Sequence, residues 1–429
     1  MIPLVILGIS FLTHFIALGH PASVVFDEVF YGRFMSDYWQ NIHFFDQHPP
    51  FFKLLMTGIG YLSGASRHFA DWTSIGNPVP DEIIILRIIP LVAGTLLPLV
   101  IYALCRRLDF SKAASVVAGL LVCLETSLLI QSRFILPDVV MLLTGFASIL
   151  LYMEWLRSET RHPRWFLIAS ILCMAATVST KWTGLAFLLV IFAMEAYRRP
   201  SFKRFAAFVG AYLGIIFIFY ALLFAIHFSL IKNPGQGDAF MTAEFQSKGF
   251  AGKFIELNHV MFAVNHAMTA THSYSSKWYT WPLMQRTVFY WESPRVEGKP
   301  SSYLYYFGNP VIYWLGTLAV CCMLLQVLVK RRLNKVSFFI LLGFLVNLLP
   351  FAFIGRVMFL YHYEAALIFS IIALVYLLEQ IKAEKKRIAV ATAIVALALA
   401  AFAYWSPLIY GTPLTEKGLA NRMWMPTWR

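Results

Sequence analysis

Charged residues are scarce in this chain of 429 residues. Asp, Glu, Lys and Arg make up only 13% of it, whereas a soluble globular protein carries roughly a quarter. No internal repeat, low-complexity tract or soluble domain is recognisable, and 59% of the residues are hydrophobic. This composition excludes an ordinary soluble protein of two or three domains. It predicts one helical membrane domain over residues 1–429.

Cysteines and the familiar ligand-binding motifs are also few. The five cysteines form no metal-binding or disulfide spacing, and all lie in or beside apolar runs. There is no Gly-rich phosphate loop, no His-Glu-x-x-His and no Asp-x-Asp pair for a metal-bound nucleotide sugar. These absences argue against a nucleotide-sugar enzyme of the soluble type, and we expect no required metal or cofactor.

Apolar runs of near membrane-spanning length recur from one end of the chain to the other. We expect about eleven spans, the first one uncleaved because 1–18 has no basic leader region or clear cleavage site. The two runs at 164–178 and 183–196 are short, so we expect them to tilt or to thin the bilayer. The expected spans are 1–18, 83–104, 111–130, 135–156, 164–178, 183–196, 205–229, 303–329, 336–354, 357–380 and 388–405.

The positive charge gathers in every second connection, which indicates topology. Five short connections hold 18 of the 35 Lys and Arg residues, and the positive-inside rule places them in the cytoplasm. The net charge of +13 therefore needs no nucleic-acid partner. These basic residues are Arg106, Arg107, Lys112, Arg157, Arg161, Arg164, Arg198, Arg199, Lys203, Arg204, Lys330, Arg331, Arg332, Lys335, Lys382, Lys385, Lys386 and Arg387.

The opposite, outer side is expected to hold the segments 19–82 and 230–302 and the C-terminal tail 406–429. Both long segments are rich in Trp and Tyr, which favour the headgroup level of a bilayer. We expect residues 28–41 and 51–63 to form amphipathic helices at the lipid interface.

Acids, bases and histidines gather at this outer face, which indicates a site there, since buried charges elsewhere in a membrane are costly. Transfer of a group from a lipid-linked phosphate requires such a set. Cations would stabilise the phosphate leaving group, and a carboxylate would take the proton from an acceptor hydroxyl. The candidates are Asp27, Glu28, Asp46, His48, Arg87, Arg133, Asp138, Lys181, Lys277, Trp281, Arg356 and His362.

Several motifs in order resemble one known family over nearly the whole chain. Phe26-Asp27-Glu28-Val29, followed by Phe44-Phe45-Asp46-Gln47-His48-Pro49-Pro50 and Lys53-Leu54-Leu55, looks like the first outer loop of protein O-mannosyltransferases, glycosyltransferase family 39. The further matching stretches are Leu86-Arg87, Gln131-Ser132-Arg133 through Asp138, Thr180-Lys181-Trp182, Ser276-Lys277-Trp278 through Leu283, and Arg356 with Tyr361-His362-Tyr363.

The resemblance implies the membrane glycosyltransferase type C fold with eleven spans and an inverting transfer from a polyprenyl-phosphate sugar, with mannose the expected sugar. It implies Asp27 as catalytic base with Glu28 in support. Cations matched to donor-phosphate binding are Arg87, Lys181 and Arg133, whereas Asp46 and His48 would shape the acceptor side. It also implies a possible dimer and, in a bacterial cell, the inner membrane with the site on the periplasmic face.

Other interpretations stay open at this point. Asp27 could simply cap a helix, and Arg87 could be an interfacial arginine. Asp27 and Glu28 point about 100° apart on a helix, so a shared-proton pair is not expected. The acceptor could be Ser or Thr of a protein, or a glycolipid or polysaccharide, which the missing soluble domain between spans slightly favours. A lipid or sugar transporter is the alternative outside the enzyme class.

Overall fold

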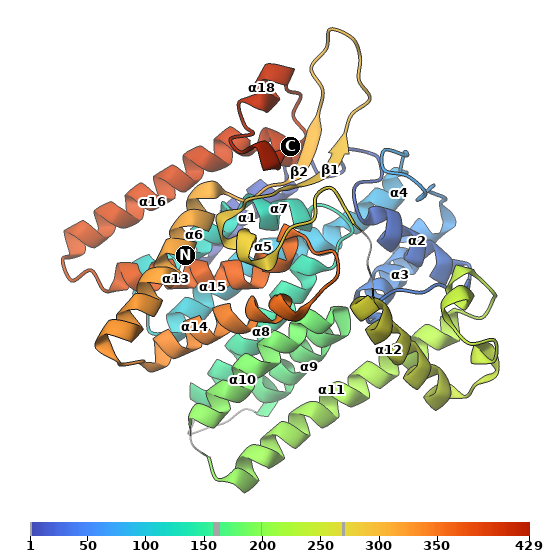
Figure 1. Cartoon of the computed structure of the whole chain (residues 1–429), viewed down its shortest axis with the longest axis horizontal. Coiled ribbons are helices and arrows are strands. Elements are labelled where there is room, and N and C mark those ends of the chain that lie inside the picture. The colour runs from blue at the N-terminus through green and yellow to red at the C-terminus, as the bar shows by residue number, and fades with distance from the viewer. Residues whose placement is uncertain (1, 158–163, 199, 268–270) are drawn as a thin grey trace.

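The computed structural model describes residues 2–157, 164–198, 200–267 and 271–429. Two of the basic residues expected in the cytoplasm, Arg161 and Arg199, lie outside the described residues. The described chain is a bundle of apolar helices (Figure 1) around one large hydrophobic core, with a small second cluster at Phe224, Phe245, Leu257 and Met261. Mean hydropathy and length together identify seven helical stretches that could cross a membrane.

These seven stretches coincide with expected spans. One runs through α4 (Asp81–Ile84) and a 3₁₀ turn into α5 (Ile88–Arg107). Another joins α14 (Lys335–Val346) to the 3₁₀ helix Leu349–Phe353. The others are α8 (Asp138–Arg157), α11 (Phe202–Leu230), α13 (Pro310–Lys330), α15 (Glu364–Glu379) with the 3₁₀ turn before it, and α16 (Glu384–Trp405).

The expected span at 111–130 is wrong in one respect, because it is not a single helix. It consists of α6 (Lys112–Cys123) and α7 (Thr126–Ser132), which meet at an angle of 57°. Glu125 stands at the break and accepts hydrogen bonds from Ser127 N at 3.0 Å and Asn309 N at 2.9 Å. The carboxylate satisfies the Ser127 N–H, which a continuous helix would satisfy itself, and it joins the break to Asn309 before α13.

Three further expected spans are shorter apolar helices, namely α1 (Ile2–Phe15), α9 (Arg164–Thr180) and α10 (Leu185–Tyr197). The first outer segment contains α2 (Glu28–Trp39) and α3 (Phe51–Ser63), close to the two helices expected there. Elements that the sequence patterns did not predict are α12 (Phe250–Ala267), α17 (Pro407–Tyr410) and α18 (Glu416–Ala420).

A small sheet corrects the expected start of the span at 303–329. Strand β1 (Val288–Glu292) pairs antiparallel with β2 (Tyr303–Tyr306), so residues 303–306 are extended. Helix α13 begins only at Pro310, after Asn309 accepts a capping hydrogen bond from Val311 N at 3.2 Å. The aromatic and β-branched residues of both strands suit a sheet as well as a membrane helix.

The helices pack so closely that some positions admit only a residue without a side chain. A Cβ at Gly343 would lie 2.1 Å from the Phe369 ring, so α14 approaches α15 only because that residue is glycine. Figure 1 shows α2, α3 and α12 gathered on one side of the bundle, with the β hairpin rising beside them. This arrangement brings the two long outer segments together beside α9 and α10.

Candidate functional site

Asp27 stands directly before a helix, but its carboxylate makes no hydrogen bond to the backbone of that helix. Phe26 has a left-handed φ of 47°, its N–H donates to Tyr290 O at 3.2 Å, and its ring stacks on Tyr290 at 4.0 Å. Asp27 precedes α2 but makes no side-chain capping hydrogen bond. The capping interpretation is therefore wrong, and a strained non-glycine residue directly before a free carboxylate is typical of functional sites.

The neighbouring Glu28 has quite different surroundings. It is fully buried and accepts hydrogen bonds from Val25 N and Ile135 N, each at 3.0 Å. Arg87 completes the set through Nε at 2.8 Å and an Nη at 2.6 Å. No hydrogen bond joins the carboxylates of Asp27 and Glu28 within the described residues, and Glu28 anchors the loop that carries Asp27.

The surroundings of Asp27 raise its pKa to about 7, chiefly because burial disfavours the charged form. The nearby Lys181 ammonium opposes this shift, whereas the carboxylates of Asp138 and Asp46 add to it. Asp27 is half-buried and, within the described part of the chain, its carboxylate accepts no hydrogen bond. A carboxylate with a pKa near neutrality can both take up and release a proton at physiological pH.

Lys181 and Asp138 come from separate elements and form a bidentate pair. Lys181 follows the end of α9, and its Nζ donates to both carboxylate oxygens of Asp138, the first residue of α8, at 2.7 and 2.8 Å. The same ammonium lies 5.6 Å from the centre of the Tyr361 ring. Both members of the pair are almost entirely buried, so their charges act in a medium that screens them poorly.

A second buried cation organises the loop before α3. Lys53 donates to Asp46, to His48 O at 2.8 Å and to Pro49 O at 3.3 Å, while His48 N donates to Asp46 at 3.2 Å. These bonds fix the segment that carries the His48 ring. Burial lowers the pKa of His48 well below its usual value, and the charges of Lys181 and Arg356 lower it further, so the ring is neutral.

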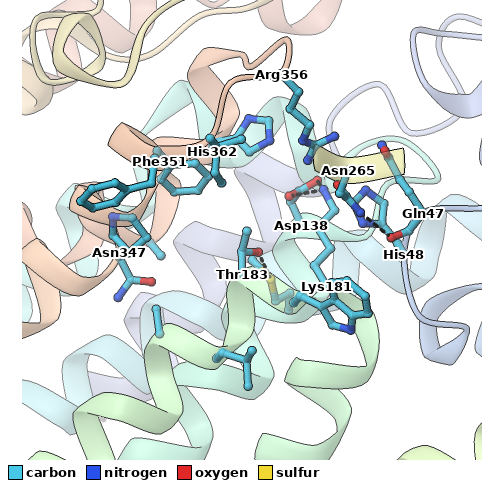
Figure 2. Close-up of a pocket in the computed structure, with 18 of the residues that line it drawn as sticks. Gln47, His48, Asp138, Lys181, Thr183, Asn265, Asn347, Phe351, Arg356 and His362 are labelled. Atoms are coloured by element: carbon cyan, nitrogen blue, oxygen red, sulfur yellow. Dashed lines mark hydrogen bonds and ion pairs between the residues drawn. The ribbon is translucent and has the colours of Figure 1, made fainter. Parts of the chain in front are cut away.

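Some of these groups border a cavity of about 430 Å³. His48, Asp138 and Lys181 line it together with Arg356 and His362. Figure 2 shows the Arg356 side chain directed to the same part of the cavity as the Asp138–Lys181 pair. Among the described residues, Arg356 makes no hydrogen bond or ion pair. It therefore has donors free for an anion.

The opposite wall of the cavity is apolar and reaches the outside of the bundle. It is formed by residues of α10, α12 and the end of the α14 stretch, among them Leu185, Leu189, Phe262, Phe351 and Phe353. Phe353 is 87% exposed and Phe262 63% exposed, so this wall continues onto the surface that the helices present to lipid. At the outer rim, Asn265 of α12 donates to Gln47 O at 3.1 Å and closes the cavity against the first loop.

Seven of the expected site residues are not among those that border the cavity, namely Asp27, Glu28, Asp46, Arg87, Arg133, Lys277 and Trp281. Arg87 is 1% exposed, and beyond Glu28 it donates to Pro21 O and Ser23 O, each at 2.7 Å. Arg133 donates to the carbonyls of Ile16, Ala17 and His20 just after α1. This geometry does not support the expected contact of either arginine with a phosphate, because most of their donors already bind backbone or carboxylate oxygens.

Lys277 and Trp281 lie beside and in the 3₁₀ helix Trp278–Leu283, which packs against the 3₁₀ helix Leu360–Tyr363. Trp281 is fully buried, donates to Ser276 Oγ at 2.9 Å and stacks on the His362 ring with centroids 5.8 Å apart. The Trp281 ring therefore packs against His362 and helps to fix the position of its ring. Lys277 is exposed and is not among the residues that border the cavity.

Sequence reasoning assigned no role to Lys53 and overlooked two further contributors, Glu364 and Asn265. Lys53 was visible in the loop motif, but its partners were not predictable. Glu364 follows Tyr361-His362-Tyr363 at the start of an apolar run, and an acid at that place is itself a signal of function. Asn265 belongs to a helix that was not expected. Within the described residues, no group of His, Cys, Asp and Glu could hold a metal ion.

Family comparison assigns both halves of the chain. Residues 4–232 match the family described as dolichyl-phosphate-mannose-protein mannosyltransferase. Residues 250–428 match the C-terminal four TMM region of protein-O-mannosyltransferase. The fold and the site define a multi-pass membrane protein with a lipid-accessible, charged cavity. The chain belongs to the protein O-mannosyltransferase family.

The curated relatives are larger proteins. Protein O-mannosyltransferase 1 of Drosophila melanogaster is 33% identical over 255 residues, which are 56% of this chain and 29% of that protein. Dolichyl-phosphate-mannose--protein mannosyltransferase 4 of Candida albicans is 32% identical over 256 residues, which are 54% of this chain and 34% of that protein. The alignments thus span about a third of the length of these relatives.

Solved structures share the fold. The Saccharomyces cerevisiae protein O-mannosyltransferase Pmt1-Pmt2 complex bound to the sugar donor matches with a TM-score of 0.90 at 18% identity, over 100% of this chain and 93% of that chain. ArnT from Cupriavidus metallidurans matches with a TM-score of 0.58 at 12% identity, over 95% of this chain and 76% of that chain. The chain has the membrane glycosyltransferase type C fold that we expected.

Proposed function

We propose that this protein transfers mannose from a polyprenyl-phosphate carrier to a hydroxyl group of a protein, with inversion at the anomeric carbon. One observation carries the proposal: a single cavity joins a charged end to an apolar wall that reaches the lipid-facing surface. A lipid-linked sugar phosphate has the same two parts. Its prenyl chain would lie along α10, α12 and Phe353, and its phosphate would lie at Lys181 and Arg356.

In the proposed reaction, the acceptor oxygen attacks the anomeric carbon of the sugar from the face opposite the phosphate. Asp27 accepts the hydroxyl proton as the new carbon–oxygen bond forms. The bond between the anomeric carbon and the phosphate oxygen breaks, and the carrier phosphate leaves as an anion. No general acid is needed, because a phosphate is a stable leaving group.

Fixed positive charge stabilises the negative charge that develops on the leaving phosphate. We assign this to Arg356, which has free donors, and to Lys181, which Asp138 holds in place. Arg87 and Glu28 contribute indirectly, because they anchor the loop that carries Asp27. Arg133 anchors the chain after α1.

The acceptor side is proposed at the rim formed by Asp46 and His48, where Lys53 fixes the loop. The curated relatives are named as protein mannosyltransferases, which favours a protein acceptor. A glycolipid or polysaccharide acceptor would use the same donor chemistry and is the outcome to test against it.

We propose that the charged end of the cavity faces the outer side of the membrane. Described basic residues such as Arg106, Arg107 and Lys330 lie at the other ends of their helices, as the positive-inside rule requires of the cytoplasmic side. The bacterial setting stays a prediction, since the curated relatives named above are eukaryotic. Dimer formation also stays a prediction, although the matching yeast structure is a Pmt1-Pmt2 complex.

The test is transfer by the purified protein from polyprenyl-phosphate-mannose to a Ser/Thr-rich peptide in detergent, followed by mass spectrometry. The wild type should add mannose and release polyprenyl phosphate, whereas Asp27→Asn should not. Release without peptide modification would indicate a different acceptor. Transport of the labelled donor into proteoliposomes at equal rates in both proteins, with no transfer, would contradict the proposal.

A further inference from the structure

Glu364 is a buried acid that the proposed reaction does not use. It is the first residue of α15, directly after Tyr361-His362-Tyr363, and it is 2% exposed. It lines the same cavity as Asp138, Lys181 and Arg356.

Within the described residues, neither carboxylate oxygen of Glu364 has a hydrogen-bond partner. The Tyr306 hydroxyl lies close to this carboxylate but makes no hydrogen bond of good geometry, and it too is without a partner. A buried polar group without a partner costs free energy, and a carboxylate costs more than most. Such groups are rare in native proteins and call for an explanation.

Two other buried glutamates show what a structural role looks like in this chain. Glu28 accepts bonds from two backbone amides and from Arg87, through both of its oxygens. Glu125 accepts from Ser127 N, Ser127 Oγ and Asn309 N through one oxygen. Glu364 holds no element in place by comparable bonds, and its carboxylate borders the cavity that would take the donor.

The cavity also restricts what the partner of Glu364 can be. An anion is repelled by a carboxylate, so a phosphate would bind at the Arg356 and Lys181 part and not beside Glu364. A cation is not expected as the partner either. The basic side chains that border the cavity are already in place, and no set of described residues could hold a metal ion. A neutral group with several hydrogen-bond donors fits best, and the hydroxyl groups of a hexose are such donors.

We infer that Glu364 accepts hydrogen bonds from hydroxyl groups of the hexose carried by the lipid phosphate, and that it is a specificity-determining residue for the sugar. This inference rests on the proposed function, which supplies the hexose. Two carboxylate oxygens can accept from two neighbouring hydroxyls. A site built to bind a hydroxyl group rejects analogues without it, because the buried acceptor is then left unpaired.

The experiment compares Glu364→Met, which is apolar and of similar length, and Glu364→Gln with the wild type. Donors are polyprenyl-phosphate-mannose and its analogues lacking one ring hydroxyl at a time. With the mannosyl donor, Glu364→Met should lower kcat/KM about 10- to 100-fold, as expected for a lost hydrogen bond to a charged group. With the analogue that lacks the bound hydroxyl, wild type and variant should differ less than threefold.

Binding is measured separately, so that the two proposals can fail separately. Polyprenyl-phosphate-mannose should raise the Tm of the wild type more than polyprenyl phosphate alone, and this difference should vanish in Glu364→Met. That readout does not depend on transfer. If the wild type transfers no mannose yet shows the difference, the proposed function fails and the sugar contact stands.

Unliganded stability separates recognition from structure. Glu364→Met should leave the Tm unchanged or raise it, since it removes an unpaired buried acid, whereas Glu125→Met should lower it. The inference is overturned if Glu364→Met keeps kcat/KM within twofold for every donor. It is equally overturned if the variant loses the same factor with every deoxy analogue, or if its loss of activity follows a loss of unliganded stability.

Discussion

The ammonium of Lys181 donates to both carboxylate oxygens of Asp138, at 2.7 and 2.8 Å. Asp138 begins α8 and Lys181 follows the end of α9, and 42 residues lie between them in the chain. Their pairing fixes a cation at the cavity wall. Arg356 has no described partner, so its positive charge is not compensated, and we propose it as the main contact of the donor phosphate.

Lys181→Met should lower kcat about 100- to 1,000-fold, the usual effect of removing one donor to developing negative charge. Asp138→Asn should lower activity less. The double variant should be no worse than Lys181→Met, because Asp138 acts through the lysine. Steady-state kinetics of the three variants measure this. Losses that simply multiply in the double variant would show that Asp138 has an independent role.

Asp27→Asn should lower kcat about 100- to 10,000-fold, the range over which a general base contributes. Folding should be unaffected, because the Asp27 carboxylate makes no hydrogen bond within the described residues. Asp81→Asn is the matched control, since Asp81 is an exposed aspartate at a helix start in the same outer segment. Equal losses in the two variants would rule out a special role for Asp27.

The pKa of about 7 for Asp27 predicts a rise of kcat/KM with pH. The base must be unprotonated, so activity should increase roughly tenfold between pH 6 and pH 8 and then level off. A pH profile measured with the mannosyl donor checks this limb. A flat profile over that range would indicate that proton transfer to Asp27 does not limit the reaction.

Arg87→Met should destabilise the protein by about 3–5 kcal/mol, because it leaves the buried Glu28 carboxylate without its cation. Arg87→Lys should rescue little, since an ammonium cannot reproduce the forked contacts with Glu28, Pro21 O and Ser23 O. Thermal unfolding of the purified variants in detergent measures the loss. If Arg87→Met kept the wild-type Tm but raised the KM for the donor, the originally expected phosphate contact would be correct.

Arg356→Gln should raise the KM for the lipid-linked donor about tenfold or more, and Arg356→Lys should recover part of the loss. Lys277→Gln is the matched control. Lys277 is an exposed cation of the outer segment 230–302, and its side chain does not border the cavity. It should change the KM less than twofold. A larger effect of Lys277→Gln would place the donor phosphate nearer to the segment 230–302.

Many features of the fold and of the site could be predicted from local patterns in the sequence. Apolar runs of bilayer length, basic connections and the Asp27-Glu28 motif require only neighbouring residues to be recognised. The first-loop helices at 28–39 and 51–63 and most expected spans agree with the structure for this reason. Where one pattern suits two structures, as for the aromatic residues 303–306, the pairing with β1 decided between strand and helix.

Only the tertiary structure decided which charges serve the site. Arg87, Arg133, Lys181 and Arg356 look alike in the sequence, as cations near the ends of apolar runs. Their roles depend on partners far along the chain: Arg87 binds Glu28, Lys181 binds Asp138, and Arg356 has no described partner. A buried charge is defined by what surrounds it, and those surroundings form only when distant segments pack together.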